Sequence, residues 1–262
     1  MKLAASNIGW SAGSDDEVMH YMTDRGFTGL EIAPTRLFPD SPYDSIALAS
    51  DFAEKVKTEY GFSICSMQSI WYGMRQRIID SETSRNELFA YTEKALRFAE
   101  AVGCSNLVFG CPRNRSYDDF YDIPVLEEFL HRCAEKAAEY GAVIALEANP
   151  PIYHTNFINT TLQALETIKK IDHPSLKLNL DFGTVIENSE SFDCISEDVN
   201  LISHVHISEP NLVQIKQRAE HRELMQLLAD ATYQGYISIE MGSQGNILDA
   251  IDYLSSIVEQ LT

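Results

Sequence analysis

Positive charge is scarce in this sequence. The 262 residues include 20 lysines and arginines against 39 aspartates and glutamates, which gives a formal net charge of −19. Nucleic-acid binders gain affinity when Lys and Arg replace the counterions of the phosphate backbone, so we expect no nucleic-acid partner. The acidity is typical of the surface of a soluble cytoplasmic enzyme, and one local Arg or Lys would suffice to hold a small anionic substrate.

Long hydrophobic runs are also missing. No window approaches the roughly 18 consecutive apolar residues of a membrane span, and the first residues, MKLAASNIGW, lack the basic and apolar regions of a secretory signal. We therefore expect a cytoplasmic protein with no membrane contact. The cysteines are five, an odd number, without CxxC spacing, and we expect reduced thiols. They are Cys65, Cys104, Cys111, Cys133 and Cys194.

No linker rich in Pro, Gly or Ser and no low-complexity segment divides the chain, so we expect one domain over residues 1–262. Apolar runs alternate with amphipathic stretches, several of which stop at Gly, a common helix terminator. The predicted strands are Lys2–Ile8, Gly29–Ala33, Phe62–Met67, Asn106–Phe109, Ala142–Glu147, Leu176–Asp181, Ser203–Ile207 and Tyr236–Glu240. The predicted helices are Asp15–Arg25, Asp44–Tyr60, Glu82–Val102, Pro124–Tyr140, Thr160–Ile171, Glu190–Val199, Gln217–Tyr233 and Asn246–Leu261.

Eight such alternations imply a parallel sheet, and the count of eight favours an α/β fold of the (β/α)8 TIM-barrel type. An open doubly wound sheet is the alternative. That fold is typically marked by a GxGxxG first turn, and the corresponding segment here, SNIGWSAGSDD, lacks it. The sequence therefore predicts a barrel.

Four of the predicted strands end in a residue that can bind a metal. These residues are Glu147, Asp181, His206 and Glu240, separated by 34, 25 and 34 positions, about one strand-plus-helix unit each. In a TIM barrel the carboxyl ends of the strands meet at one rim, where active sites lie. A strand-end acid or His alone is more often a helix cap, but four in consecutive units favour a shared site.

Three carboxylates and one imidazole suit one divalent ion of the group Mn²⁺, Co²⁺, Mg²⁺ or Zn²⁺. A structural zinc site would favour closely spaced Cys and His. Such an ion could polarise a carbonyl group and stabilise the enediolate that forms when a neighbouring C–H proton is removed. Glu147 and Glu240 could share that proton transfer, one removing the proton and the other returning it. Return to the opposite face gives epimerisation, and return to the next carbon gives isomerisation.

The order Glu–Asp–His–Glu on the last four strands resembles that of the xylose-isomerase-like TIM barrels, and more closely the sugar phosphate isomerase/epimerase group that includes the ketose 3-epimerases. The resemblance covers essentially the whole chain and is carried by LEANPP, LNLDFG, HVHISEP and ISIEMG, with VFGCPRNR on the fourth strand. It implies a divalent metal bound by the four residues and an acid/base pair of the two glutamates.

Three positions depart from the ketose 3-epimerase pattern. The His three residues after the Asp ligand is Thr184 here, the Glu six residues after the first ligand is Tyr153, and the Arg six residues after the His ligand is Leu212. The residues that would contact the sugar hydroxyl groups therefore differ from those of the ketose 3-epimerases. Endonuclease IV shares the superfamily, but the His-rich multi-metal site and basic face that it needs are not visible.

Five further residues are candidates for substrate binding, and each has a structural alternative. Asn149 follows the first ligand, where it could instead fix the ANPP loop, and Gln68 with Trp71 follows the third strand, where the ring could simply cover the barrel end. Arg115 could hold an anionic group or be a surface loop residue, and His221 could reach the mouth or be a solvated residue of a helix. Glu31, at the end of the second strand, is as compatible with a buried salt bridge as with substrate contact.

These observations predict a metal-dependent isomerase or epimerase acting on a small sugar, sugar phosphate or polyol. A dehydratase of a polyol ketone is the first alternative, since inosose dehydratases share the superfamily and the same enolate can expel a hydroxyl group. A non-catalytic sugar-binding barrel is the second. A homo-oligomer is compatible with the sequence, although no interface stripe is visible in it.

Overall fold

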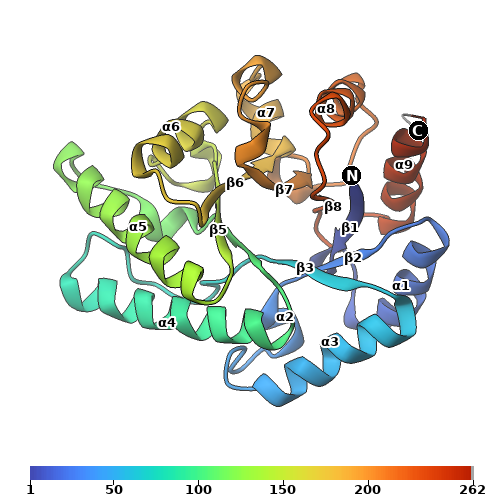
Figure 1. Ribbon diagram of the computed structural model, residues 1–262, viewed down its shortest axis with the longest axis horizontal. Helices are drawn as coiled ribbons and strands as arrows, with labels where there is room; N and C mark the ends of the chain where they lie inside the picture. Colours follow the sequence, from blue (N-terminus) through green and yellow to red (C-terminus); the bar gives the residue numbers. More distant parts are fainter. Residues whose placement is uncertain (261–262) are drawn as a thin grey trace.

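Eight parallel strands form a closed barrel in which each strand pairs with its neighbours in the sequence and β1 pairs with β8 (Figure 1). The structure is a computed structural model, described here for residues 1–260. The strands are β1 (Lys2–Ser6), β2 (Gly29–Ile32), β3 (Ser63–Met67), β4 (Asn106–Phe109), β5 (Val143–Glu147), β6 (Leu176–Asp181), β7 (Ile202–Ile207) and β8 (Tyr236–Ile239). The predicted (β/α)8 fold is confirmed.

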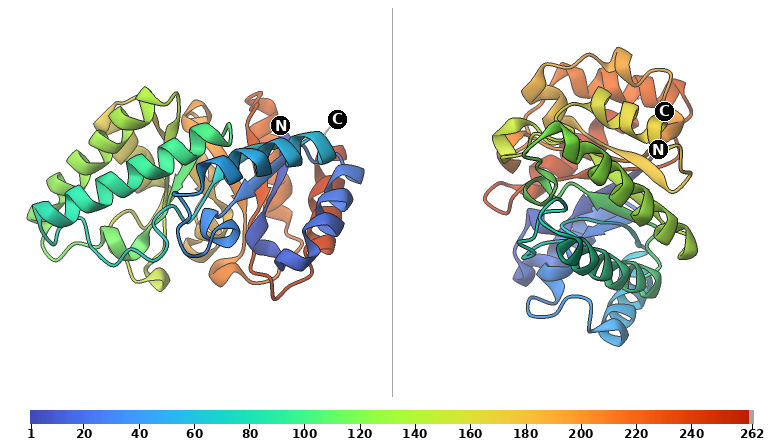
Figure 2. Two further views of the ribbon diagram at one scale, coloured as in Figure 1. Left: turned by 90° about the horizontal axis from the view of Figure 1, so that it is seen from below. Right: turned by 90° about the vertical axis from the view of Figure 1, so that its left-hand side faces the viewer.

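Helices surround the barrel on its outside, and α1 lies beside α9 so that the ring of helices closes (Figures 1 and 2). The helices are α1 (Asp15–Asp24), α2 (Pro34–Leu37), α3 (Ile46–Tyr60), α4 (Glu82–Ala101), α5 (Ile123–Glu139), α6 (Thr161–Ile171), α7 (Phe182–Asn188), α8 (Ala219–Asp230) and α9 (Ile247–Glu259). Local sequence fixes several ends. Thr160 and Gln163 form a capping box at the start of α6, and Gly61 ends α3 with a φ of 76°.

One predicted helix is wrong. Glu190–Val199 contains one 3-10 turn, Phe192–Cys194, and only the first residue of a second, and the helix of this unit is α7, which begins directly after β6. The reason is local, because the Asp181 carboxylate accepts a hydrogen bond from the Thr184 N–H and so caps a helix at the strand end. The short α2 was not predicted. The bounds of the other predicted elements agree within three residues, and Leu261 of the last predicted helix lies outside the described residues.

The two faces of the barrel strands differ in chemistry. In β6, Leu176, Leu178 and Leu180 belong to the apolar core. Asn179 instead donates to Glu147 of β5, and Asp181 accepts from Ser208, which directly follows β7. Successive side chains of a strand point to opposite faces, so these two polar residues face the inside of the barrel. The barrel interior is therefore partly polar, and the candidate site is built at its carboxyl end.

Candidate metal centre

The four predicted ligands lie on one rim. Glu147 and Asp181 are the last residues of β5 and β6, and His206 is paired with Asp181 in the register of β6 and β7. Glu240 directly follows β8, where its N–H donates to the carbonyl of Ile207 at 2.9 Å. Four consecutive strands thus deliver one ligand-type side chain each to the same end of the barrel.

Their side chains converge around one ring nitrogen. Nδ1 of His206 lies 3.2 Å from Oε2 of Glu147 and 3.2 Å from Oε2 of Glu240. Ligand-type atoms of Asp181, His206 and Glu240 all lie within 4.8 Å of one another. The three carboxylates line a cavity of about 210 Å³, and the His206 side chain is fully buried beneath it.

This donor set fits a single divalent ion. Three buried carboxylates around one imidazole carry more negative charge than the imidazole can balance, and a buried excess of one charge is costly unless a counterion compensates it. The set is dominated by oxygen, which suits Mg²⁺ or Mn²⁺ and is compatible with Co²⁺ or Zn²⁺.

The pKa directions of the four groups reflect this crowding. Burial alone would lower the pKa of His206, but the charges of Glu240 and Glu31 raise it well above its usual value. Burial raises the pKa of Glu240 to about 7, and burial together with the charge of Glu147 raises the pKa of Asp181. Burial works against ionisation of Glu147 as well, yet the hydrogen bond and charge of His206 lower its pKa.

Neighbouring polar groups hold the carboxylates in place. Asp181 accepts hydrogen bonds from the N–H and the hydroxyl of Thr184, both at 2.8 Å, and from the hydroxyl of Ser208. Glu147 accepts from the amide of Asn149 at 2.8 Å and from the amide of Asn179 at 2.6 Å. The orientation of both carboxylates is therefore fixed by the protein.

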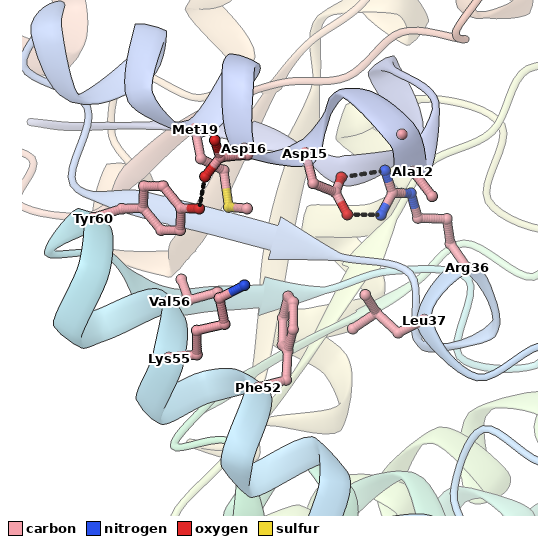
Figure 3. Close-up of a pocket in the computed structure, with 11 residues that line it drawn as sticks. Ala12, Asp15, Asp16, Met19, Arg36, Leu37, Phe52, Lys55, Val56 and Tyr60 are labelled. Carbon is pink, nitrogen blue, oxygen red and sulfur yellow. Dashed lines mark hydrogen bonds and ion pairs between the residues drawn. The ribbon is translucent and has the colours of Figure 1, made fainter.

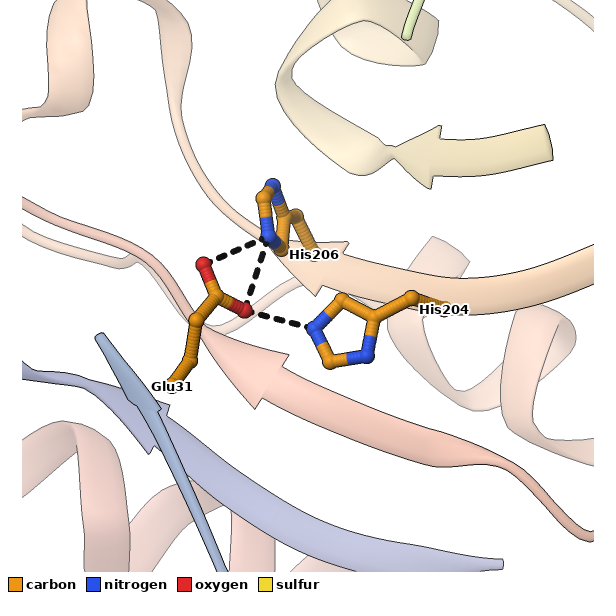
Figure 4. Close-up of side chains that lie close together, drawn as sticks. All are labelled: Glu31, His204 and His206. Carbon is orange, nitrogen blue, oxygen red and sulfur yellow. Dashed lines mark hydrogen bonds and ion pairs between the residues drawn. The ribbon is translucent and has the colours of Figure 1, made fainter. Parts of the chain in front are cut away.

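A second charged cluster, of Glu31, His204 and His206, shares His206 with the first (Figure 4). Nε2 of His206 is 3.0 Å from both carboxylate oxygens of Glu31, and Nε2 of His204 is 2.6 Å from one of them. All three side chains are at most 1% exposed. All three are residue types that can bind a metal, and they lie close together. Their ligand atoms are, however, joined by direct hydrogen bonds, and none of the three residues lines the cavity. We interpret this cluster as the support of His206, because metal-binding histidines commonly use their second nitrogen in this way.

Of these two partners, the sequence pointed to Glu31 but left a salt bridge and a substrate contact open, and the structure gives the salt bridge. His204 was missed. Its signal was available, since residues two apart in a strand share a face and the segment SHVHIS places His204 beside His206.

Two of the five predicted substrate residues, Gln68 and Asn149, line the cavity. Trp71 does not, because its ring packs edge-on against Phe109 and Phe129 and its N–H donates to the Thr92 hydroxyl at 2.8 Å. Trp71 therefore lies between β4 and the helices α4 and α5, as part of the apolar core, and forms no wall of the cavity.

Arg115 and His221 also lie outside the cavity lining, and both are buried, so the alternatives of a surface loop Arg and a solvated His are wrong as well. The Arg115 guanidinium is fully buried and donates to the carbonyl of Glu147 at 2.8 Å and to Oδ1 of Asn149 at 2.9 Å, so it braces the β5 end from behind. His221 is buried between α7 and α9, where its ring lies 4.0 Å from that of Phe182 and its Nδ1 is 3.0 Å from the hydroxyl of Tyr253.

The remaining cavity lining comes from loops that follow the strands. Tyr153 and Leu212, singled out in the sequence as departures from the family pattern, both belong to it. Sequence reasoning did not propose the other members, of which Val108 lies within β4 and the rest follow the end of a strand, where such residues are expected. These are Ser69, Val108, Gly110, Cys111, Pro112, Ser208 and Glu209.

A larger cavity of about 440 Å³ lies outside the barrel between α1 and α3 (Figure 3). Its charged groups already have partners in the protein, and Lys55 is paired with Glu59 at 3.6 Å. Arg36 binds both carboxylate oxygens of Asp15, and Asp16 accepts the Tyr60 hydroxyl at 2.6 Å. No cluster of ligand-type residues is found there within residues 1–260, so we place the candidate chemistry at the barrel end.

Comparison with protein families finds that residues 20–257 match the model described as xylose isomerase-like TIM barrel. A human protein named as a candidate hydroxypyruvate isomerase is 26% identical over 183 residues, which are 63% of this chain and 63% of that protein. The ketose 3-epimerase of Arthrobacter globiformis is 34% identical over 79 residues, 30% of this chain and 27% of the relative. The chain thus matches less than two thirds of the length of either relative.

Solved structures show the same fold at low identity. The D-psicose 3-epimerase of Clostridium cellulolyticum H10, determined with D-tagatose, has a TM-score of 0.77 at 18% identity over 99% of this chain and 96% of that chain. A probable 3-DHS dehydratase of Bacillus anthracis has a TM-score of 0.74 at 17% identity over 100% and 98%. Within residues 1–260 no helix combines the length and the apolar character that a membrane crossing requires.

Proposed function

Because the chain belongs to the xylose isomerase-like TIM-barrel family, we propose that it is a divalent-metal-dependent isomerase or epimerase of a small carbohydrate or polyol ketone. One observation carries the proposal. Glu147 from β5 and Glu240 from β8 reach the same nitrogen of His206 from two strands and line the same cavity. A substrate in that cavity would have a carboxylate on each side.

The chain's own residues divide the work. Glu147, Asp181, His206 and Glu240 would hold the ion, for which Mn²⁺ is our first candidate. When bound, the ion would polarise the substrate carbonyl. One glutamate then removes the proton from the carbon next to that carbonyl, and the C–H electrons form an enediolate. The other glutamate returns a proton. Return to the opposite face of the same carbon gives the epimer, and return to the former carbonyl carbon gives the isomer, with the hydroxyl proton of the first carbon passing to the former carbonyl oxygen.

The cavity residues around the glutamates fix geometry. Both polar atoms of the Asn149 amide bind within the protein, the nitrogen donating to Glu147 and the oxygen accepting from Arg115. Its role is therefore to orient the Glu147 carboxylate. Gln68 donates to the Ser6 hydroxyl at 2.7 Å and accepts from the Ser69 hydroxyl at 3.1 Å. Both residues contribute a rigid polar wall, and such preorganisation is a large part of catalysis.

Incubation with Mn²⁺ and candidate ketoses in D₂O tests the proposal. If the protein is an isomerase or epimerase, deuterium enters the substrate at the carbon next to the carbonyl and the substrate loses no water. Glu147→Gln and Glu240→Gln should each abolish this exchange. Loss of one water from the substrate would identify a dehydratase instead. Ligand binding without any exchange of carbon-bound hydrogen, unchanged in Glu240→Gln, would identify a sugar-binding barrel.

Two further proposals are open to simple measurements. We propose one divalent ion per chain, which metal analysis of the purified protein would detect. We also propose a cytoplasmic location, supported by the five free cysteines, of which Cys104 and Cys133 are buried. The state of the thiols in protein isolated under alkylating conditions would test that point.

A further inference from the structure

We propose that Tyr153 and Leu212 form a rim that makes the cavity select an uncharged ketose with an apolar terminal carbon, that is, a deoxy sugar ending in a methyl group. The inference rests on the proposed function, because it names the substrate class of the same site.

The charge of the cavity disfavours anionic substrates. Four acidic residues line it, Glu147, Asp181, Glu209 and Glu240, and among the described residues no Lys or Arg does. A bound divalent ion would leave the three ligand carboxylates in excess by one charge. A phosphate or carboxylate group of a substrate would find no protein cation in the lining, and burying it unpaired is costly.

The nearest arginines are already engaged. The Glu209 carboxylate, which is 1% exposed, is held by Arg218 through two hydrogen bonds of 2.7 and 2.6 Å. Arg115 is buried behind Glu147 and Asn149. Neither guanidinium can move to a substrate anion without leaving a buried acceptor unpaired.

Tyr153 offers one donor to the cavity. Its hydroxyl oxygen accepts the N–H of Asn211 at 2.8 Å, which ties the β5 loop to the β7 loop and leaves the O–H free to donate. Burial and the nearby Asp181, Glu240 and Glu147 charges raise its pKa to about 12, so the hydroxyl keeps its proton. It is placed to donate to a substrate hydroxyl group.

Leu212 offers only a hydrocarbon surface. Its N–H donates to the Glu209 carbonyl at 2.9 Å, and its carbonyl accepts the N–H of Gly242 at 2.8 Å. Both backbone polar groups are therefore used within the protein, and the isobutyl side chain is what the residue contributes to the lining.

The β7 loop is held in this shape. Asn211 and Leu212 have φ values of 61° and 53°, a conformation that is rare for residues other than Gly and unusual for a branched side chain. The buried Glu209 fixes the loop on both sides, since it also accepts the Lys216 N–H at 3.2 Å. A locally unfavourable conformation that is so firmly held is a reasonable basis for a functional hypothesis.

Three ketoses that differ only at the terminal carbon test the inference. They are a ketohexose, its 6-deoxy analogue and its 6-phosphate, each studied with the Mn²⁺ protein by calorimetric binding and by deuterium exchange. We expect the 6-deoxy sugar to bind roughly tenfold more tightly than the parent, because a hydroxyl against Leu212 would lose its hydrogen bonds. We expect the 6-phosphate to bind most weakly.

Three variants separate the roles. Leu212→Gln should remove or reverse the preference for the 6-deoxy sugar, and Leu212→Arg should strengthen binding of the 6-phosphate at least tenfold over wild type. Tyr153→Phe should weaken the 6-deoxy sugar and the parent by the same factor, leaving their ratio unchanged. Circular dichroism and Tm of each variant serve as folding controls.

The outcomes are distinct. Three results would overturn the inference. Wild type could bind the 6-phosphate most tightly, Leu212→Gln could leave the ratio of the parent and 6-deoxy affinities unchanged, or none of the three sugars could bind. If the sugars bind in the expected order but exchange no deuterium, the selectivity stands while the proposed isomerase or epimerase function fails.

Discussion

The two ring nitrogens of His206 face different surroundings. Nδ1 faces Glu147, Glu240 and the cavity, whereas Nε2 faces Glu31 inside the barrel (Figure 4). On the cavity side, three carboxylates share one imidazole. On the inner side, one carboxylate shares two imidazoles, those of His204 and His206. The cavity side therefore carries the larger excess of carboxylates, which is the charge pattern that the proposed cation would balance.

The comparison teaches that residue type alone does not identify a metal site. Glu31 and the cavity carboxylates are all acids at strand ends, but Glu31 is fully buried and bound to both histidines. Burial would raise the pKa of Glu31, yet the charges of His206 and His204 hold it well below its usual value. The candidate centre differs from the inner cluster in two ways: its carboxylates outnumber its imidazoles, and they line a cavity.

Replacing a cavity carboxylate should have the largest effect. Asp181→Ala removes one of the proposed ligands, and we expect Mn²⁺ affinity to fall on the order of 1,000-fold, with deuterium exchange lost. Calorimetry and metal analysis measure this. Asp40→Ala, a change at an exposed acid, is the matched control and should bind metal like wild type. Full metal content in Asp181→Ala would refute the ligand assignment.

Replacing the inner carboxylate should have a smaller effect on the same quantity. Glu31→Gln keeps the shape of the side chain but removes the charge that faces Nε2 of His206, and we expect a roughly 10- to 100-fold loss of metal affinity. The exposed Glu128→Gln is the control. Wild-type affinity in Glu31→Gln, measured by the same calorimetry, would mean that the inner cluster only fills the barrel.

The sequence predicted the barrel and the four proposed ligands together, because both follow from the same pattern. Each of the last four apolar runs ends in a ligand-type residue, and parallel strands place those residues on one rim, as the pairing of Asp181 with His206 shows. The start of α7 was missed because Asp181 serves as a helix cap as well as a candidate ligand.

The direction of loop and helix side chains was less predictable. Arg115 lies in a 3-10 turn, Pro112–Arg115, that directs the guanidinium back under Glu147, which spacing along the chain cannot show. For His221 a signal existed. It recurs with Leu224, Met225 and Leu228 at helical spacing, and all four are buried. This apolar stripe indicated a core position.

His221 extends the comparison to a histidine with no carboxylate partner. Burial lowers its pKa to about 4, below the unfolded value of 6.5. The unfolded chain therefore binds a proton before the folded one does, and this contribution to stability is present above pH 6.5 and is lost as the pH falls toward 4. Between pH 7.5 and 5.5 we expect His221 to cost about 1.4 kcal/mol of the free energy of unfolding.

Urea denaturation of wild type and His221→Gln at both pH values measures this cost as a difference, because every other titrating group is common to the two proteins. The pH range stays above the sequence pI of about 4.6, where association would interfere. Equal pH dependence of the two proteins would show that the pKa of His221 is the same in the folded and unfolded states, so that burial does not lower it.

The smallest effect is expected at Thr184, which supports the cavity side without lining it. Its hydroxyl lies 2.8 Å from both Oδ2 of Asp181 and the carbonyl of Ala148. Thr184→Val keeps the shape and the N–H that also reaches Asp181, so we expect a loss of about 1 kcal/mol in stability and a few-fold loss in metal affinity. Thr184→Ser, which retains the hydroxyl, should restore both. If Thr184→Val equals Glu31→Gln in its effect on metal binding, the Asp181 carboxylate depends on its support as much as His206 does, and the contrast between the two sides of the imidazole disappears.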